Sequence, residues 1–171
     1  MSYQRGKVPI IGVICGSKPP KHYLPIGEQV GELVAKEGYW IICGGLGGLM
    51  EAVCKGASKH DGFTIGVLPG TSVTDANPYI SLPIATGVGY ARNSIIVMTA
   101  DVLVAIDGAE GTLSEMCYGI VYGKPIIAIS LESDPVPMGG IMVHKRDSAG
   151  FVVVETAKDA IGRVKEILDA D

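Results

Sequence analysis

The sequence predicts an α/β fold, a doubly wound parallel sheet of about six to seven strands with helices on both faces. Short apolar runs recur along the chain, and their continuous rather than alternating hydrophobicity is typical of strands buried on both faces. The segments between these runs carry apolar residues at three- and four-residue spacings, as amphipathic helices do. Glycine-rich turns follow several of the runs, where a strand would pass into a helix.

The expected strands and helices alternate along the chain. In order, the strand and helix pairs are residues 8–14 with 24–37, 39–43 with 48–60, 63–68 with 90–99, 101–106 with 112–122, and 151–154 with 156–168. Residues 125–130 form a further apolar run. A minor strand at 81–85 stays open, because Pro83 restricts it to a sheet edge or to no strand. With no repeat or linker, we expect residues 1–171 to form a single Rossmann-like domain for a nucleotide or phosphate ligand.

The composition favours a small-molecule partner over nucleic acid or a membrane. A net charge of -4 with no basic run gives no electrostatic attraction to either polyanionic surface. No segment approaches the ~20 apolar residues of a membrane-spanning helix. The cysteines show no C-x-x-C spacing, and this predicts reduced thiols in the cytoplasm. They are Cys15, Cys43, Cys54 and Cys117.

Three glycine-rich turns fall where ligands gather in such a sheet, beyond the carboxyl ends of its strands. They are residues 15–17 (CGS), 44–50 (GGLGGLM) and 107–115 (DGAEGTLSE). The last one opens a helix, so it aims free backbone N–H groups and a positive helix end at an anion. The ligand contacts expected from these turns are Gly16, Ser17, Gly44, Gly45, Gly47, Gly48, Met50, Gly108, Gly111 and Thr112.

Two common nucleotide-binding fingerprints fail. The best G-x-G-x-x-G register starts at Gly45 and puts Met50 at the third glycine, after the second strand rather than the first. The Walker pattern fails because Gly123-Lys124 is followed by Pro125 and begins a strand. The glycines of residues 44–48 could still be a tight turn alone, but four in five positions favour close approach of the backbone to a ligand.

Two charged side chains are candidates for the site. Arg92 stands in the first turn of the expected helix 90–99, where the helix dipole disfavours a cation. This placement favours a guanidinium that holds an anionic ligand, the alternative being a surface arginine in water. Glu115 either faces the crevice or completes a capping box with Thr112, in which both side chains satisfy backbone donors at the helix start.

Other segments carry weaker signals. His22, His60 and His144 lie far apart with no ligand-like spacing, so we predict no zinc site. Residues 68–89, punctuated by proline and glycine, form either a lid over the crevice or a simple connector.

Together these motifs resemble the superfamily of the LOG (Lonely Guy) phosphoribohydrolases, often mislabelled lysine decarboxylases, and more closely its branch of molybdenum cofactor carrier-like proteins. The resemblance covers roughly residues 8–130 and lies in the order of the three turns with an arginine between the last two. In the hydrolases that arginine and the final glutamate cleave the N-glycosidic bond of a nucleoside 5′-monophosphate. The resemblance therefore implies Arg92 and Glu115 as the catalytic pair, and a homodimer or higher homo-oligomer.

The chain departs from the hydrolase pattern at three positions. Asn93 follows the arginine where those enzymes carry lysine, Ala109 replaces the second glycine of the phosphate turn, and Asp107 replaces a proline. A methyl group at Ala109 would oppose a left-handed backbone, and Asp107 would repel a phosphate. These departures favour binding, with Asn93 as a further ligand contact.

The sequence thus predicts binding of a phosphorylated small molecule or oxyanion, as in a molybdenum cofactor carrier-like protein. The expected ligand is the molybdenum cofactor, molybdate or an AMP-like nucleotide, with no cofactor required for catalysis. A LOG-like phosphoribohydrolase and a non-catalytic nucleotide sensor are the alternatives. Lysine decarboxylation would need a pyridoxal Schiff-base lysine, and Lys124 before Pro125 is not placed for one.

Overall fold

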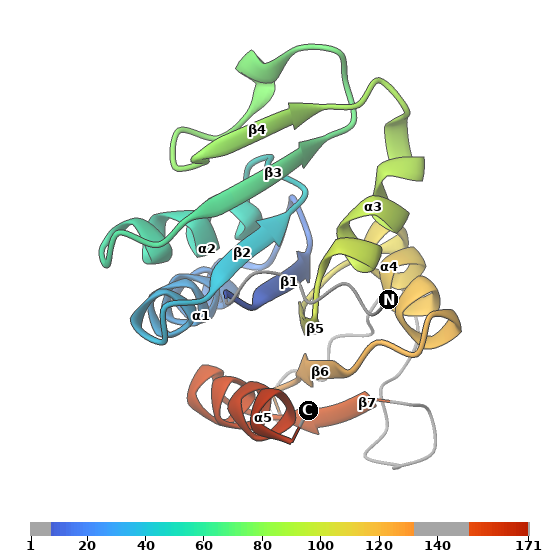
Figure 1. Cartoon of the computed structure of the whole chain (residues 1–171). Coiled ribbons are helices and arrows are strands. Elements are labelled where there is room, and N and C mark those ends of the chain that lie inside the picture. The colour runs from blue at the N-terminus through green and yellow to red at the C-terminus, as the bar shows by residue number, and fades with distance from the viewer. Residues whose placement is uncertain (1–7, 132–150, 171) are drawn as a thin grey trace.

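A seven-stranded parallel sheet runs through the computed structural model, which describes residues 8–131 and 151–170 (Figure 1). Its strands are β1 (Ile10–Cys15), β2 (Trp40–Cys43), β3 (Thr64–Leu68), β4 (Leu82–Ala85), β5 (Val102–Ile106), β6 (Ile126–Ile129) and β7 (Phe151–Val154). Their order in the sheet is β4-β3-β2-β1-β5-β6-β7, and every pairing is parallel. The predicted α/β fold is confirmed.

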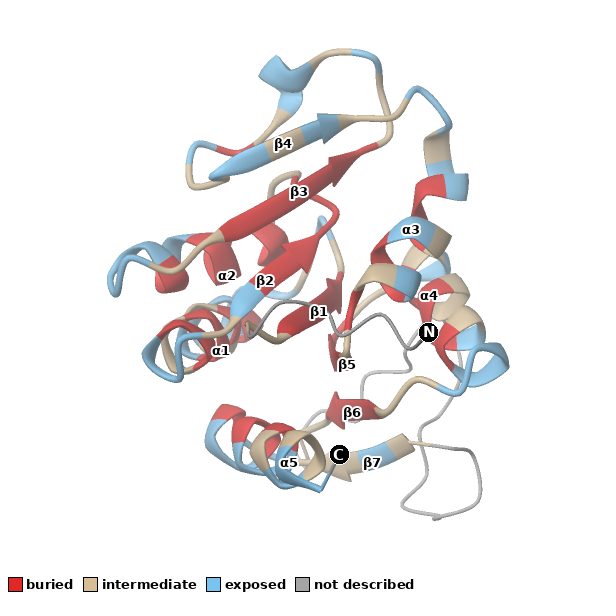
Figure 2. Cartoon of the chain, in the orientation of Figure 1, coloured by how far each residue is buried: buried red, intermediate tan, exposed pale blue. Residues whose placement is uncertain are grey.

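Helices cover both faces of the sheet. The helices α1 (Leu24–Lys36), α2 (Leu49–Ser58) and α5 (Ala157–Asp169) pack on one face, and α3 (Arg92–Thr99) and α4 (Glu110–Val121) pack on the other. The side chains of β1 show the division, because alternate residues of a strand point to opposite faces. Ile11 and Val13 join the core under α1, α2 and α5, whereas Ile10 and Ile14 join the core under α3 and α4. Burial on both faces explains the continuous apolar runs (Figure 2).

The winding of the chain reverses at β1. This central strand pairs with β2 on one side and β5 on the other, so that Ile11 lies beside both Ile41 and Val102. Crossovers from the two halves therefore leave the sheet in opposite directions between β1 and β5. In open α/β sheets this switch point opens a crevice at the carboxyl ends of the strands.

The segment 81–85 is a strand at the edge of the sheet. Residues 82–85 pair with β3, and Pro83 lies opposite Gly66. A proline is tolerated there because the outer side of an edge strand has no ladder to donate to. Two predicted helix starts were displaced: α3 begins at Arg92 after a 3-10 turn at Gly89–Ala91, and α4 begins at Glu110 rather than at 112.

Helices α1 and α2 approach each other through glycines. A methyl group built on Gly31 would lie 1.9 Å from the carbonyl oxygen of Val53, and one on Gly56 would lie 1.9 Å from that of Glu28. Only glycine at these two positions allows backbone-to-backbone contact.

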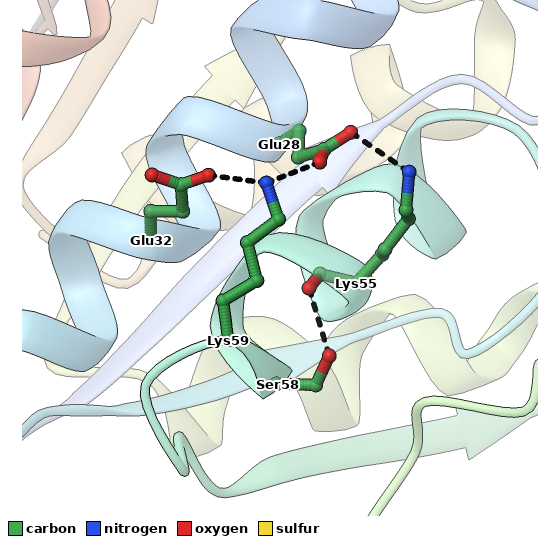
Figure 3. A network of polar contacts seen from close by, with 5 residues as sticks. All are labelled: Glu28, Glu32, Lys55, Ser58 and Lys59. Carbon is green, nitrogen blue, oxygen red and sulfur yellow. Dashed lines mark hydrogen bonds and ion pairs between the residues drawn. The ribbon is translucent and has the colours of Figure 1, made fainter.

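An ion-pair network joins the exposed rim of the same two helices (Figure 3). There the Lys59 ammonium lies 2.5 Å from Glu28 and 2.6 Å from Glu32.

Candidate functional site

A cavity of about 170 Å³ opens at the carboxyl edge of the sheet, beside the winding reversal. Its walls come from the end of β1, the turn after β2, the start of α3 and the start of α4. The lining residues are Val13, Cys15, Gly16, Ser17, Gly44, Leu46, Met50, Tyr90, Arg92, Asn93, Ala109, Glu110, Gly111, Thr112 and Glu115.

Backbone contacts tie the three glycine-rich turns together. The Gly16 N–H donates a 3.0 Å hydrogen bond to the Asp107 carbonyl, and the Leu49 N–H donates a 3.1 Å bond to the Gly16 carbonyl. Gly48 has φ +71°, and a methyl group on it would lie 2.3 Å from the Ser17 carbonyl oxygen. The turns therefore meet because their backbones touch directly.

The first turn of α4 faces the cavity with its backbone. The N-cap of α4 is Ala109, so Thr112 lies inside the helix and the capping-box interpretation of Thr112 and Glu115 is wrong. The first N–H groups of a helix have no partner within the helix, and the residues that carry them here, Glu110, Gly111 and Thr112, line the cavity. Such a helix end attracts an anion.

The turn before α4 has a conformation that its sequence did not suggest. The backbone of Ala109 is extended, with φ -114°, so this residue does not need the left-handed conformation that its methyl group would oppose. The left-handed residue is instead Asp107, with φ +33°. Asp107 is buried but is not among the cavity-lining residues. The expected steric objection to Ala109 is therefore removed.

Arg92 is buried beneath the cavity, with 8% of its surface exposed. Its Nη1 donates hydrogen bonds to the carbonyls of Gly44 and Val67, at the ends of β2 and β3. Its Nε is buried and has no hydrogen-bond partner within residues 8–131 and 151–170. The alternative of a surface arginine in water is wrong. A methyl group on Gly44 would lie 2.9 Å from Nη2 and 2.7 Å from the Met50 sulfur, so a larger residue at this position would make one of these side chains shift.

Glu115 projects from α4 into the same cavity and is 7% exposed. Burial raises the pKa of Glu115 to about 8, and the positive charge of Arg92 only partly opposes this rise. Burial likewise lowers the pKa of Arg92, while Glu115 opposes the fall. At neutral pH the Glu115 carboxyl is thus largely protonated, and it can donate a hydrogen bond to an anion.

Three thiols are buried near the ends of β1 and β2 and in α2, and one of them, Cys15, lines the cavity. The sulfurs of Cys43 and Cys54 lie 3.7 Å apart, and the Gly45 N–H donates to the Cys43 sulfur at 3.4 Å. The hydrogen bond from Cys54 lowers the pKa of Cys43 against the effect of burial, with help from Gly45 and Arg92. Burial raises the pKa of Cys15, which lines the cavity. Among the side chains that line the cavity, Arg92 is the one that carries a positive charge.

Two asparagines brace the site. Asn93 donates from Nδ2 to the Gly111 carbonyl at 3.2 Å and to Ser114 Oγ at 2.8 Å, which holds the first turn of α4 against α3. Asn77 donates from Nδ2 to the carbonyls of Gly45 and Leu46, at 3.3 and 3.0 Å. Segment 68–89, which contains Asn77, supports the glycine-rich turn, and none of its residues lines the cavity.

The structure brings most of the predicted site residues together. Those that line the cavity are Gly16, Ser17, Gly44, Met50, Arg92, Asn93, Gly111, Thr112 and Glu115. The remaining ones, Gly45, Gly47, Gly48 and Gly108, lie outside its lining. Sequence reasoning missed Val13, Cys15, Leu46, Tyr90, Ala109 and Glu110. Val13 and Cys15 could have been found, because alternate residues of β1 share the face on which Cys15 ends the strand.

His144 lies outside the described residues, and within the described ones no group of three histidine, cysteine or acidic side chains could hold a metal ion. Among the described helices, none has the length and apolar character to span a bilayer.

The chain is similar to a known family and to a related archaeal protein. The chain matches the SLOG cluster4 family over residues 7–161. An uncharacterized protein of Archaeoglobus fulgidus is 37% identical over 135 residues, covering 79% of this chain and 87% of that protein.

Two solved structures share the fold and about a third of the sequence. The molybdenum cofactor binding protein of Rippkaea orientalis superposes with a TM-score of 0.86 and 30% identity, over 96% of this chain and 99% of that one. The molybdenum cofactor carrier protein of Chlamydomonas reinhardtii gives 0.81 and 31%, over 94% and 99%. These likenesses confirm the predicted resemblance to the LOG-like superfamily and its carrier branch. The chain belongs to the SLOG cluster4 family.

Proposed function

We propose that the cavity binds a phosphorylated small molecule or an oxyanion, and that the protein acts as a molybdenum cofactor carrier-like protein. Two similar structures, at 30% and 31% identity, are of a molybdenum cofactor binding protein and a molybdenum cofactor carrier protein. The observation that carries the proposal is the buried Arg92 guanidinium, whose Nε has no hydrogen-bond partner among the described residues, in one cavity with the first turn of α4.

The donor set suits an anionic group. Gly111 and Thr112 offer backbone N–H groups, and Thr112 adds a hydroxyl. Arg92 supplies the counter-charge, and the protonated Glu115 a further donor. These residues would hold the phosphate of the molybdenum cofactor or a molybdate ion.

Substitution of Arg92 tests this proposal. Loss of a buried charge-assisted donor weakens anion binding at least about tenfold. We therefore expect Arg92→Met to raise the Kd for sodium molybdate by that factor or more, measured by isothermal titration calorimetry at pH 6.5. Arg163→Met is the matched control, because Arg163 lies exposed on α5 and pairs with Glu166. Equal affinities in wild type and Arg92→Met, with both proteins folded by circular dichroism, contradict the proposed role.

A second candidate is a phosphoribohydrolase, because Arg92 and Glu115 line one cavity. Incubation with AMP, followed by chromatography for free adenine, separates the candidates. A carrier releases no adenine. If wild type releases adenine and Glu115→Gln does not, the result supports hydrolysis. If the protein binds AMP without releasing adenine, and binds neither molybdate nor a pterin phosphate, the result supports a nucleotide sensor.

We further propose that two copies pair through the outer surface of α3 and α4. Several large apolar side chains of these two helices and of the residue that follows α4 are exposed: Ile95, Met98, Ile120, Val121 and Tyr122. Lys124, just beyond α4, donates to the carbonyls of Met98 and Ala100, which joins the two helix ends into one surface. An exposed apolar surface of this kind is typical of subunit contacts.

Charge placed on this surface is expected to separate the copies. Val121 is 76% exposed, so Val121→Glu leaves the fold intact and puts like charges opposite each other in a symmetric dimer. Light scattering after gel filtration should give an oligomeric mass for wild type and a monomeric mass for this variant. Val73→Glu, at an exposed valine outside α3 and α4, should keep the wild-type mass. A monomeric wild type contradicts the proposal.

We also place the protein in the cytoplasm. Its four cysteines are free thiols, and the neighbouring sulfurs of Cys43 and Cys54 are not joined in a disulfide, which supports a reducing compartment.

A further inference from the structure

We propose that Tyr90 is a stacking platform for the planar heterocycle of the ligand whose anionic group occupies the cavity. This inference rests on the proposed function and narrows it, because it requires a ligand that carries both an anionic group and a flat ring. A pterin phosphate has both parts, and a bare oxyanion has only one.

Tyr90 stands at the rim of the cavity. It is a lining residue and yet is 80% exposed. Its Cε1 lies 3.7 Å from the position that a methyl group on Gly111 would take, so the ring borders the first turn of α4. It also lies two residues before Arg92, which lines the same cavity. The ring therefore adjoins both components of the proposed anion site.

The backbone fixes Tyr90 at this position. The residue belongs to the 3-10 turn that precedes α3, and Gly87 and Gly89 before it have positive φ angles of 68° and 59°. The Gly89 N–H donates to the Pro69 carbonyl at 3.0 Å, and the Gly87 N–H donates to the Gly70 carbonyl at 2.9 Å. These bonds anchor the turn to the chain that leaves β3. A side chain on an anchored backbone loses less conformational entropy on binding than one on an unanchored loop.

The cavity is too small to enclose a large ligand, so part of such a ligand would lie at this rim. Pockets that enclose a drug-sized ligand measure roughly 300 to 1,000 Å³. The cavity of about 170 Å³ accommodates a phosphate or molybdate group but not a whole nucleotide or pterin. The ring of such a ligand must therefore lie outside the enclosed part, where Tyr90 offers an open aromatic face.

Exposure of an aromatic side chain does not by itself place it in a ligand site, since much of any protein surface is apolar. Tyr122 is 48% exposed and stacks on Tyr118, but it does not line the cavity. Tyr90 differs by its place beside the donors of α4 and by its anchored backbone.

The test compares ligands with and without a ring. Binding of neopterin 3′-monophosphate, AMP, ribose 5-phosphate and inorganic phosphate is measured by calorimetry on wild type, Tyr90→Ala, Tyr90→Phe and Tyr122→Ala. Stacking on an aromatic side chain is lost in Tyr90→Ala, which we expect to raise the Kd of a ring-bearing ligand about tenfold. The ring-free ligands should keep their Kd within about twofold. Tyr90→Phe retains the ring face and should bind as wild type does, as should Tyr122→Ala.

The outcomes separate this inference from the proposed function. If Tyr90→Ala leaves the pterin and AMP affinities unchanged, or weakens ribose 5-phosphate as much as the pterin, Tyr90 is not a stacking platform, although the anion site stands. If wild type binds none of the four ligands and no molybdate, the proposed function fails and this inference fails with it.

Discussion

Replacing Gly31 with alanine is expected to lower the free energy of unfolding by about 3 kcal/mol or more. The added methyl group would lie 1.9 Å from the Val53 carbonyl oxygen and 2.9 Å from the Ala57 nitrogen. Both are backbone atoms of α2, so the clash cannot be relieved by a side-chain rotation and the two helices must separate. Alanine gains at most about 1 kcal/mol over glycine within a helix, which is too little to offset the separation.

Gly162→Ala is the matched control for this prediction. Gly162 lies in α5, and a methyl group there would meet nothing within 4 Å. The same substitution should therefore stabilise the protein by about 0.5 to 1 kcal/mol. Urea unfolding followed by circular dichroism measures both variants. Equal effects of the two substitutions would show that α1 and α2 are not packed backbone to backbone.

The stability of the protein should fall steeply as pH rises from about 4.5 to about 8. Glu115 has an ordinary pKa of 4.5 in the unfolded chain and a pKa of about 8 in the folded protein. Between these values the folded state binds a proton that the unfolded state releases, so its stabilisation is complete below pH 4.5 and is lost as pH rises through 8. The free energy at stake is about 5 kcal/mol.

Glu115→Gln should remove this pH dependence, because an amide stays neutral at every pH. The free energy of unfolding is measured in urea at pH 5 and pH 9 for wild type and variant. Glu110→Gln, which changes an exposed carboxylate on the same helix, should keep the wild-type difference between the two values of pH. If Glu115→Gln shows the same difference in the free energy of unfolding between pH 5 and pH 9 as wild type, the pH dependence comes from groups other than Glu115. The same titration predicts weaker molybdate binding above pH 8, where Glu115 becomes an anion.

The fold was predictable because its strands are buried on both faces. Continuous apolar runs located the strands, and even the edge strand β4 was foreseen as a possibility through Pro83. The spacing of the turns also placed Arg92 and Thr112 on one crevice, since the carboxyl ends of parallel strands share an edge.

What the sequence could not predict depends on contacts across the fold. Thr112 and Glu115 have the spacing of a capping box, yet the helix begins earlier, at Glu110 after the N-cap Ala109, and the residue with a positive φ before it is Asp107. Gly108 must then lack a side chain, since a methyl group there would lie 2.1 Å from Thr112 Oγ1. The bonds of Asn93 to α4 join residues 18 and 21 positions apart, and no local pattern encodes them.

The central claim is that backbone N–H groups at the start of α4, with Arg92 beneath them, hold an anion. A crystal of the protein soaked in sodium molybdate tests it most directly, through the anomalous scattering of molybdenum. The account predicts a molybdenum peak in the cavity, with oxyanion atoms within hydrogen-bond distance of the Gly111 and Thr112 nitrogens. Molybdenum found only at surface lysines, with the cavity open to solvent and free of it, would contradict the account.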